Sequence, residues 1–402
     1  MRIILLRQYN PFVENGASAN RFRGLIDGLC QNGHSVTIGV TGGFIKQDEK
    51  NCSTLPQNCE VLYLSRANHF NGVLSRLNLY FFRGLSFFVT AKRLNLCVKQ
   101  RDFDIIWLTN NGIVLRLFLQ YLQNSAGKSF IELNEFNDIY KEEKKGNFLQ
   151  RRAGKRDSRI FVDAVGKIDL FAVMTKTLMS YYKQMAKPSA LFMHLPMTVD
   201  LSRFSNIQPT SDDNYIRPYI AFTGTMNNQK DGVDVLIKAF ARIADKYPTL
   251  HLYLAGFWHY DVPDQETLIA EFGLNSRIHY VGILDRDQIP SFISNATLLA
   301  LSRPDSHQAQ GGFPTKLGEY LATGNPVCVT KVGEIPDYLE DNESAFLAAP
   351  GDVDSFAEAI DKALRDETNA KRVGKNGRRI AEASFDVVKQ SERLANFLHD
   401  NL

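Results

Sequence analysis

The chain has 402 residues, 44% of them hydrophobic and 23% charged, which suits a soluble enzyme of two or three domains. No stretch approaches the roughly 18 uncharged apolar residues of a membrane-spanning helix, and the N-terminus lacks a signal-peptide pattern, so we expect a cytoplasmic protein. Five scattered cysteines without a C-x-x-C pair argue against a zinc site or disulfide framework, and the net charge of +3 is unevenly distributed.

The first half of the chain alternates short apolar runs with longer helical stretches. A first helix is predicted at 19–31 and ends before Gly33. Strands alternating with helices predict a parallel sheet that is covered on both faces. The predicted strands are 3–6, 35–40, 61–64, 105–108, 129–133 and 170–174.

Positive charge gathers in this first half. Residues 1–205 contain 28 Lys and Arg against 16 Asp and Glu, a net charge of +12, and the remaining residues carry −9. The segment 61–101 has no acidic residue, and its basic side chains are interleaved with aromatic ones. Such a helix suits an anionic membrane surface, so peripheral binding to the inner face of the membrane is one interpretation. The other is an ordinary helix with a buried aromatic face. No nucleic-acid module accompanies the charge, and we expect no nucleic-acid partner.

A polar, turn-rich segment at 205–217 predicts an interdomain linker. After it the alternation of strands and helices restarts. We therefore predict a second doubly wound domain, with ligands bound at the carboxyl ends of its strands. Its predicted strands are 219–223, 250–255, 278–281, 298–301, 326–330 and 345–348, and its predicted helices are 233–244, 316–322 and 353–364, with helix again from 367 to the end.

One glycine-containing loop, at 222–232, follows a predicted strand and precedes a helix. Gly224 would let the backbone approach a ligand, and the helix N-terminus offers unpaired amides to an anion. Lys230 can supply the positive charge that a diphosphate needs. We therefore predict that Gly224, Thr225 and Lys230 bind a phosphate-bearing ligand.

A second glycine-rich loop runs into the predicted helix 316–322. Its amides could converge on an anion, reinforced by the helix dipole. Lys316 and Glu319 lie three residues apart on one helix face, so the cation could neutralise phosphate while the carboxylate accepts hydrogen bonds from ribose hydroxyls. A plain surface ion pair between the two is the alternative. The residues predicted to bind ligand here are Gly311, Gly312, Phe313, Pro314, Thr315, Lys316 and Glu319.

The segment 219–359 resembles the C-terminal domain of the retaining glycosyltransferases of family 4, of the bacterial cell-surface polysaccharide type. The resemblance rests on the runs GTMNNQKDGVDVLIKAF, YVG, KLGEYLATGNPV and VGEIP. The loop at Gly16 and the segments 33–36 and 195–204 are also similar to family segments. The resemblance implies an α/β protein of the GT-B fold, with two facing Rossmann-like domains, parallel sheets and a cleft between them.

This resemblance also implies the domain boundaries and the reaction. The acceptor-side domain would be 1–204, the nucleotide-sugar-binding domain 218–380, and 381–402 a C-terminal helix that could pack back on the first domain. A sugar would be transferred from a nucleotide-sugar donor to a hydroxyl of a glycan or lipid-linked acceptor, with retention of its anomeric configuration. A UDP-linked donor is expected more than a GDP-linked one. Cell-surface polysaccharide or lipopolysaccharide synthesis is the expected setting. Lys230, the loop amides and Gly16 would stabilise charge growing on the β-phosphate.

Two positions depart from the family pattern. The first of two glutamates that family members commonly carry would fall at Gly311, and an arginine that often follows the strand glycine is Thr225 here. Because glycine replaces this glutamate at position 311, the resemblance does not identify the sugar that is transferred. No carboxylate-rich metal cluster is evident, so we expect metal-independent transfer without a cofactor.

On the acceptor side, Glu135 follows the predicted strand 129–133 and joins Lys230 as a candidate catalytic residue. Trp107 and Trp258 are interpreted as packing residues. Two alternatives stay open, a sugar-nucleotide 2-epimerase of the same fold and a non-catalytic sugar-nucleotide-binding protein. A nicotinamide dehydrogenase is disfavoured, because the first strand-to-helix turn, 8–20, has a single glycine.

Overall fold

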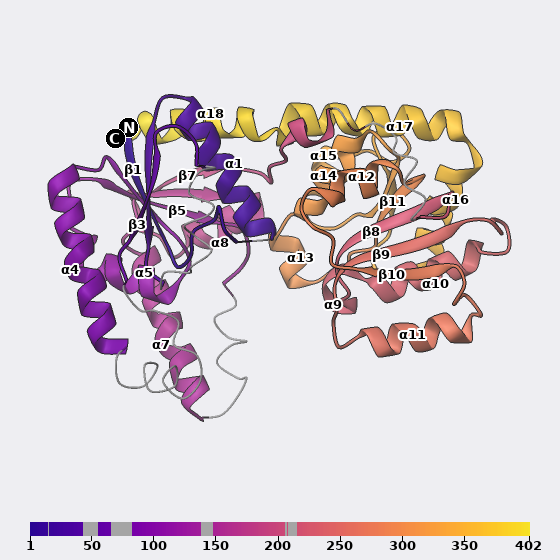
Figure 1. The fold of residues 1–402 in the computed structure, drawn as a ribbon, viewed down its shortest axis with the longest axis horizontal. Helices are drawn as coiled ribbons and strands as arrows, with labels where there is room; N and C mark the ends of the chain where they lie inside the picture. Colours follow the sequence, from indigo (N-terminus) through magenta and orange to yellow (C-terminus); the bar gives the residue numbers. More distant parts are fainter. Residues whose placement is uncertain (15, 43–54, 66–82, 138–147, 206, 208–214) are drawn as a thin grey trace. The chain divides into compact units, whose positions relative to one another are not determined.

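The computed structural model describes residues 1–14, 16–42, 55–65, 83–137, 148–205, 207 and 215–402. They form two compact units, 1–195 with 388–402, and 196–387, each built on its own parallel sheet (Figure 1). The prediction of an α/β protein with two Rossmann-like units is confirmed. Most of the predicted linker 205–217 and residues 66–82 of the basic segment 61–101 lie outside the described residues.

The first unit contains a seven-stranded sheet in the order β3-β2-β1-β4-β5-β6-β7, and every neighbouring pair is parallel. Its inner strands are apolar and buried on both faces because helices cover both sides. The strands are β1 (Arg2–Arg7), β2 (Ser35–Val40), β3 (Cys59–Tyr63), β4 (Ile105–Leu108), β5 (Lys128–Leu133), β6 (Leu170–Val173) and β7 (Leu191–His194). The helices are α1 (Ala17–Gln31), α4 (Arg83–Arg101), α5 (Gly112–Leu117) with the π-helical turn η3 (Phe118–Leu122), α7 (Phe148–Val165), α8 (Lys176–Lys183) and α18 (Val387–His399).

The last helix, α18, packs in the first unit although it ends the chain. Its residues Leu394, Ala395 and Leu398 are buried in the same apolar cluster as Ile3 of β1 and Trp107 of β4. Helix α1 lies close against it, since a Cβ atom added at Gly28 would lie 2.2 Å from the Cβ of Ser391. The C-terminal segment therefore completes the core of the N-terminal sheet.

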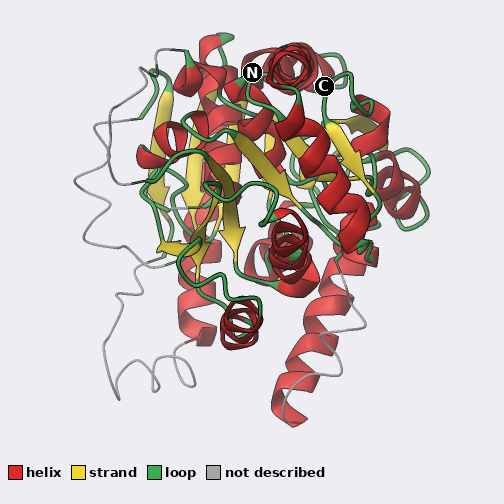
Figure 2. Ribbon diagram, turned by 90° about the vertical axis from the view of Figure 1, so that its right-hand side faces the viewer, coloured by secondary structure: helices red, strands yellow, loops and turns green. Residues whose placement is uncertain are grey.

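The second unit contains a six-stranded sheet in the order β10-β9-β8-β11-β12-β13, again parallel throughout. Helices flank the strands, which are drawn as yellow arrows in Figure 2. The strands are β8 (Tyr219–Thr225), β9 (His251–Phe257), β10 (Ile278–Gly282), β11 (Leu298–Leu301), β12 (Val327–Thr330) and β13 (Phe346–Ala348). The helices are η4 (Leu201–Phe204), α9 (Asn228–Asp231), α10 (Val233–Ile243), α11 (Val262–Glu271), α12 (Gln288–Ser294), α13 (His307–Gly311), α14 (Thr315–Thr323), α15 (Ile335–Tyr338), α16 (Val353–Arg365), α17 (Glu367–Ile380) and η5 (Ala381–Phe385).

Helix was predicted without interruption from residue 367 to the end, and the structure corrects this. After α17 and the π-helical turn η5 the helix is interrupted at Asp386, which has non-helical backbone angles. There Val199 donates its N–H to the carbonyl of Phe385 and accepts from the N–H of Val387. Two hydrogen bonds to another segment thus replace helical ones at this point.

Two further observations concern the described residues alone. Within them, no helix combines the length and apolar character that crossing a membrane would require. Cys30, Cys59, Cys97 and Cys328 are all free thiols, as the sequence predicts for these four.

Candidate functional site

The carboxyl ends of β8 and β9 in the second unit are built from tightly packed backbone. Gly224, the second-last residue of β8, has a φ of +152°, and Gly256 lies beside it in β9 with a φ of +140°. A Cβ atom at Gly256 would lie 1.7 Å from the carbonyl oxygen of Gly224, so no side chain fits between these strand ends. Glycine at both positions therefore allows β8 and β9 to pack this closely at their carboxyl ends.

A lysine from another helix occupies the space beside Gly224. Lys316, in the first turn of α14, places its Nζ 2.2 Å from the position of a Cβ atom on Gly224. The same ammonium lies 2.8 Å from Oδ1 of Asp231, and the side chains of the two residues are 17% and 6% exposed. It also lies 4.8 Å from the centre of the Phe222 ring, within cation–π range. Strand β8, α9 and α14 thus meet at one ion pair.

The environment of Lys316 disfavours its charge in part. Burial lowers the pKa of Lys316, the attraction of Asp231 opposes this, and the positive charges of Lys230 and Arg303 lower the pKa further. The net pKa stays below the ordinary lysine value. An additional anion near Lys316 would stabilise its charged form by the same Coulomb effect.

Glu319 has a different partner from Lys316. Its Oε1 lies 2.7 Å from Nη1 of Arg203, which comes from η4, and Arg203 also donates to the carbonyl of Arg286. The alternative of a surface ion pair between Lys316 and Glu319 is therefore wrong. Each charge of the pair is instead held by a residue distant in the sequence.

Tyr320, in the middle of α14, is fully buried and connects this helix to β8. The N–H of Thr223 in β8 donates to its hydroxyl at 2.7 Å. Burial raises the pKa of Tyr320, so this phenol stays neutral. The hydroxyl therefore locks α14 to the strand that carries Gly224 and Thr225.

The glycine-rich loop before α14 serves partly as core. Gly311 ends α13, and the N–H of Gly312 donates to the carbonyl of Gln308, so this amide already has a partner within the chain. Phe313 is 5% exposed and packs edge-on against Tyr338 at 5.6 Å between ring centres. Pro314 precedes α14, which begins at Thr315 and has no side-chain cap.

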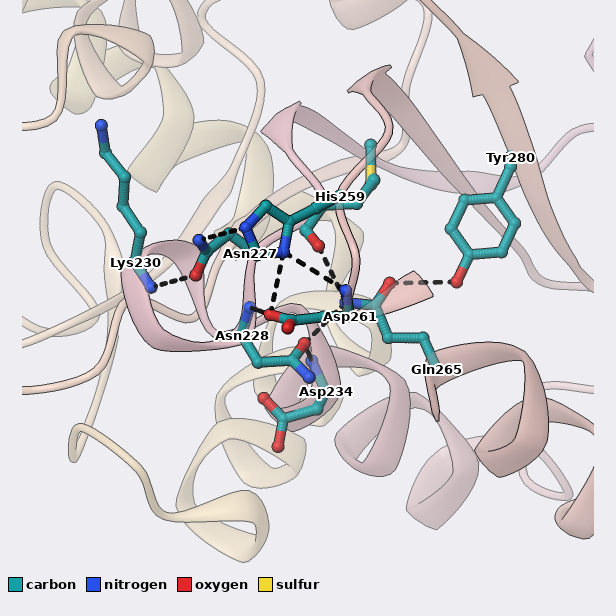
Figure 3. A network of polar contacts seen from close by, with 9 residues as sticks. Asn227, Asn228, Lys230, Asp234, His259, Asp261, Gln265 and Tyr280 are labelled. Atoms are coloured by element: carbon teal, nitrogen blue, oxygen red, sulfur yellow. Dashed lines mark hydrogen bonds and ion pairs between the residues drawn. The ribbon is translucent and has the colours of Figure 1, made fainter. Parts of the chain in front are cut away.

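A polar network ties the loop after β8 to the loop after β9 (Figure 3). Asn227 caps α9 through the N–H of Lys230 at 2.8 Å and donates to Nε2 of His259 at 3.0 Å. Asp261 accepts from the N–H of Asn228 at 2.7 Å and lies 3.2 Å from Nδ1 of His259. The side chain of Lys230 points away from this network and is exposed. The network therefore fixes the backbone of α9 and leaves the ammonium of Lys230 outside it.

Sequence reasoning missed this network and the partner of Lys316. Asn227 stands at the N-cap position of a short helix, a recognisable signal, but its contact with His259 joins segments 32 residues apart. Trp258, predicted to be a packing residue, is 63% exposed and touches Tyr280, so that interpretation was wrong. Trp107 is fully buried, as expected.

Gly16 and Glu135 lie in the first unit. Gly16 precedes α1 with a φ of +120°, and a Cβ atom there would meet no atom within 4 Å. Glu135 is exposed after β5, and its carbonyl accepts from the hydroxyl of Tyr182. Glu132, by contrast, is buried in an ion pair with Arg21. Among the described residues, no group of three or more His, Cys, Asp or Glu side chains is placed to hold a metal ion.

One protein family and several curated proteins match parts of this chain. Residues 207–380 match the family described as glycosyl transferases group 1. The 2-deoxystreptamine glucosyltransferase of Streptomyces kanamyceticus is 29% identical over 173 residues, 42% of each chain. This chain thus spans less than half the length of that curated relative.

Solved structures extend the similarity to the whole fold. Sucrose-phosphate synthase from Thermosynechococcus elongatus superimposes with a TM-score of 0.74 at 17% identity, covering 99% of this chain and 98% of that one. Anabaena HepE in complex with UDP gives 0.70 at 18% identity, with both chains covered completely. The fold of this chain is therefore GT-B, and residues 207–380 of its second unit are similar to the group 1 glycosyltransferases.

Proposed function

We propose that this chain is a glycosyltransferase that moves a sugar from a nucleotide-sugar donor to a hydroxyl of a glycan or lipid-linked acceptor, with retention of configuration. One observation carries the proposal. The segment that matches the glycosyltransferase family, 207–380, contains Lys316, Lys230 and the side-chain-free strand ends at Gly224 and Gly256. Cations beside strand ends that carry no side chain suit a diphosphate.

The donor and the setting are part of the same proposal. UDP is the first choice of nucleotide, supported by HepE, whose structure contains UDP, and GDP is the second. Synthesis of cell-surface polysaccharide or lipopolysaccharide is the proposed setting, and the reaction is proposed to need no metal. The donor would bind the second unit and the acceptor the first, where Glu135 is exposed.

In the proposed reaction, the bond between the anomeric carbon and the diphosphate oxygen breaks, and the acceptor hydroxyl forms the new bond on the same face of the sugar. The hydroxyl proton leaves with the nucleoside diphosphate. Negative charge grows on the diphosphate as the bond breaks, and Lys230 and Lys316 would stabilise it. Glu319, held by Arg203, would accept hydrogen bonds from the ribose.

Thermal-shift titration tests this function. UDP, GDP and their sugar conjugates are added to the wild type and to Lys230→Ala and Glu319→Ala. Ligand at about a hundred times its dissociation constant adds roughly 2.7 kcal/mol of apparent stability. We expect a shift that is selective for one base and reduced in both variants. If no nucleotide or nucleotide sugar raised the melting temperature of the wild type, the proposal would be contradicted.

We also propose that the first unit binds an anionic membrane surface through α4. Phe88, Lys92, Leu96 and Lys99 lie at helical spacing and are all exposed, Phe88 at 63% and Leu96 at 50%. Apolar groups that enter the interface beside cations are the signature of such binding. No described side chain of α4 is acidic.

Sedimentation with phosphatidylserine vesicles tests this second proposal. The wild type should pellet at low salt and remain in solution at high salt, because screening weakens the attraction. The double change Phe88→Ser with Leu96→Ser should reduce pelleting. Phe272→Ser serves as the matched control, since Phe272 is an exposed aromatic residue of the other unit. Wild-type protein that fails to pellet at low salt would exclude this surface.

A further inference from the structure

Asp231 is a buried carboxylate at a site for which an anionic ligand is proposed. It is 4% exposed, and it forms an ion pair with Lys316 at 2.8 Å. A carboxylate repels phosphate, so a site that only needed to attract phosphate would gain affinity by lacking it. Asp231 must therefore have a role at this site other than to increase the affinity for phosphate.

The backbone around Asp231 is fixed from several sides. The following residue, Gly232, has a φ of +70°, and a Cβ atom there would lie 2.0 Å from the carbonyl of Ser302. The hydroxyl of Ser302 donates to the carbonyl of Gly232 at 2.7 Å, and the N–H of Asp231 donates to the carbonyl of Asn227. The carboxylate thus has little freedom to leave Lys316.

The pair sets the local charge. Lys316 pairs with the carboxylate of Asp231, and the positive charge of Lys230 is near enough to act on Lys316. The ammonium of Lys316 lies against Gly224, beside the strand end that the proposed donor would approach. A nucleotide sugar carries two negative charges on its diphosphate, and the nucleoside diphosphate that leaves carries up to three near neutral pH. Any fixed negative charge near the diphosphate therefore penalises the product more than the donor.

We propose that Asp231 is a specificity-determining residue that favours the nucleotide-sugar donor over the nucleoside diphosphate product. It does so by neutralising Lys316 in place, which limits the positive charge offered to the diphosphate. The inference rests on the proposed function, because it presumes that a nucleotide sugar binds beside Gly224. Release of the product is the step that it would speed.

Calorimetry at low ionic strength measures the binding of UDP and of UDP-glucose. If only guanine nucleotides bind, GDP and GDP-mannose take their place. The readout is the ratio of the two dissociation constants. Asp231→Asn should shift this ratio in favour of the nucleoside diphosphate. If the Asp231 carboxylate and the additional product charge are about 8 Å apart, the shift is about twofold at the dielectric constant of water and about thirtyfold at an effective dielectric constant of 20. The shift should shrink in high salt.

A second variant separates charge from folding. The double change Asp231→Asn with Lys316→Met removes one charge of each sign, so the ratio should return close to the wild-type value. Asp361→Asn is the matched control, because Asp361 pairs with Lys246 at 2.5 Å in the segment that leads into the amino end of β9. It should leave the ratio unchanged.

The outcomes are distinct. If nucleotides bind and Asp231→Asn leaves the ratio unchanged, the inference is wrong and the proposed function stands. If the ratio shifts equally in the double variant, Asp231 acts through the shape of the loop, and the inference is again wrong. Absence of any nucleotide binding to the wild type overturns both.

Discussion

Breaking the buried ion pair of the first unit should cost much of its stability. Arg21 of α1 and Glu132 of β5 form this pair, with side chains that are 3% and 1% exposed. Arg21 also donates to the carbonyl of Leu195, just after β7, at 3.0 Å. One guanidinium therefore joins a helix, a central strand and the end of the sheet.

The expected magnitude follows from burial. Glu132→Gln removes the charge that faces the buried guanidinium of Arg21, and loss of one partner of such a pair costs about 3–5 kcal/mol. A typical domain has only about 5–15 kcal/mol of stability. The double change Arg21→Met with Glu132→Leu removes both charges and leaves chiefly the carbonyl of Leu195 without its donor, a cost of about 1–3 kcal/mol. The double variant should therefore be more stable than Glu132→Gln.

Urea unfolding followed by tryptophan fluorescence measures this effect. In a Trp258→Phe background, the remaining tryptophan is Trp107, which is fully buried in the same unit. Asp157→Asn is the control, since Asp157 pairs with Arg156 at the surface and such pairs contribute about 1 kcal/mol or less. A cost for Glu132→Gln as small as that of the control would refute the reasoning, as would a double variant less stable than the single one.

Three further predictions concern stability and the loops of the second unit. Burial raises the pKa of Asp169, but hydrogen bonds from Lys187 and Ser129 outweigh this and leave the pKa below its ordinary value. Ionised Asp169 thus stabilises the fold at pH values above its unfolded pKa of about 4, and this contribution is lost as the pH falls through its lower pKa in the folded protein. Asp169→Asn should therefore make the free energy of unfolding depend less on pH in the acid range. Gly256→Ala should lower the melting temperature far more than Gly273→Ala, whose Cβ meets no atom within 4 Å; similar shifts would contradict the steric account. Asn227→Ala should cost about 1 kcal/mol through loss of the α9 cap and weaken binding of the proposed donor, and unchanged titration curves would argue against a role for the network.

The sequence was most informative where a structure depends on local pattern. The apolar runs at 105–108 and 298–301 coincide with β4 and β11, because strands buried on both faces need continuous apolar residues. Strand β7 was missed, since its four residues include an exposed Leu191 at the sheet edge. Short edge strands carry little pattern to detect.

The ion pairs of the molecule lay beyond sequence reasoning for a different reason. Glu319 and Lys316 share a helix face, which suggested that they act on the ligand or on each other. The structure pairs Glu319 with Arg203, 116 residues away, and Lys316 with Asp231 on another helix. Such partners are set by how strands are ordered in the sheet, and no local spacing encodes them. The assignment of these residues to donor binding remains a prediction.

Transfer of a radiolabelled sugar tests the central claim most directly. The labelled nucleotide sugar that shifts the melting temperature of the protein is incubated with a membrane extract that supplies lipid-linked acceptors, and label in the glycan fraction is counted. We expect wild-type protein to transfer label in an α linkage from an α-linked donor, and Glu319→Ala to lose most of this activity. Conversion of the donor to an epimer, or donor binding without transfer to any acceptor fraction, would contradict the account.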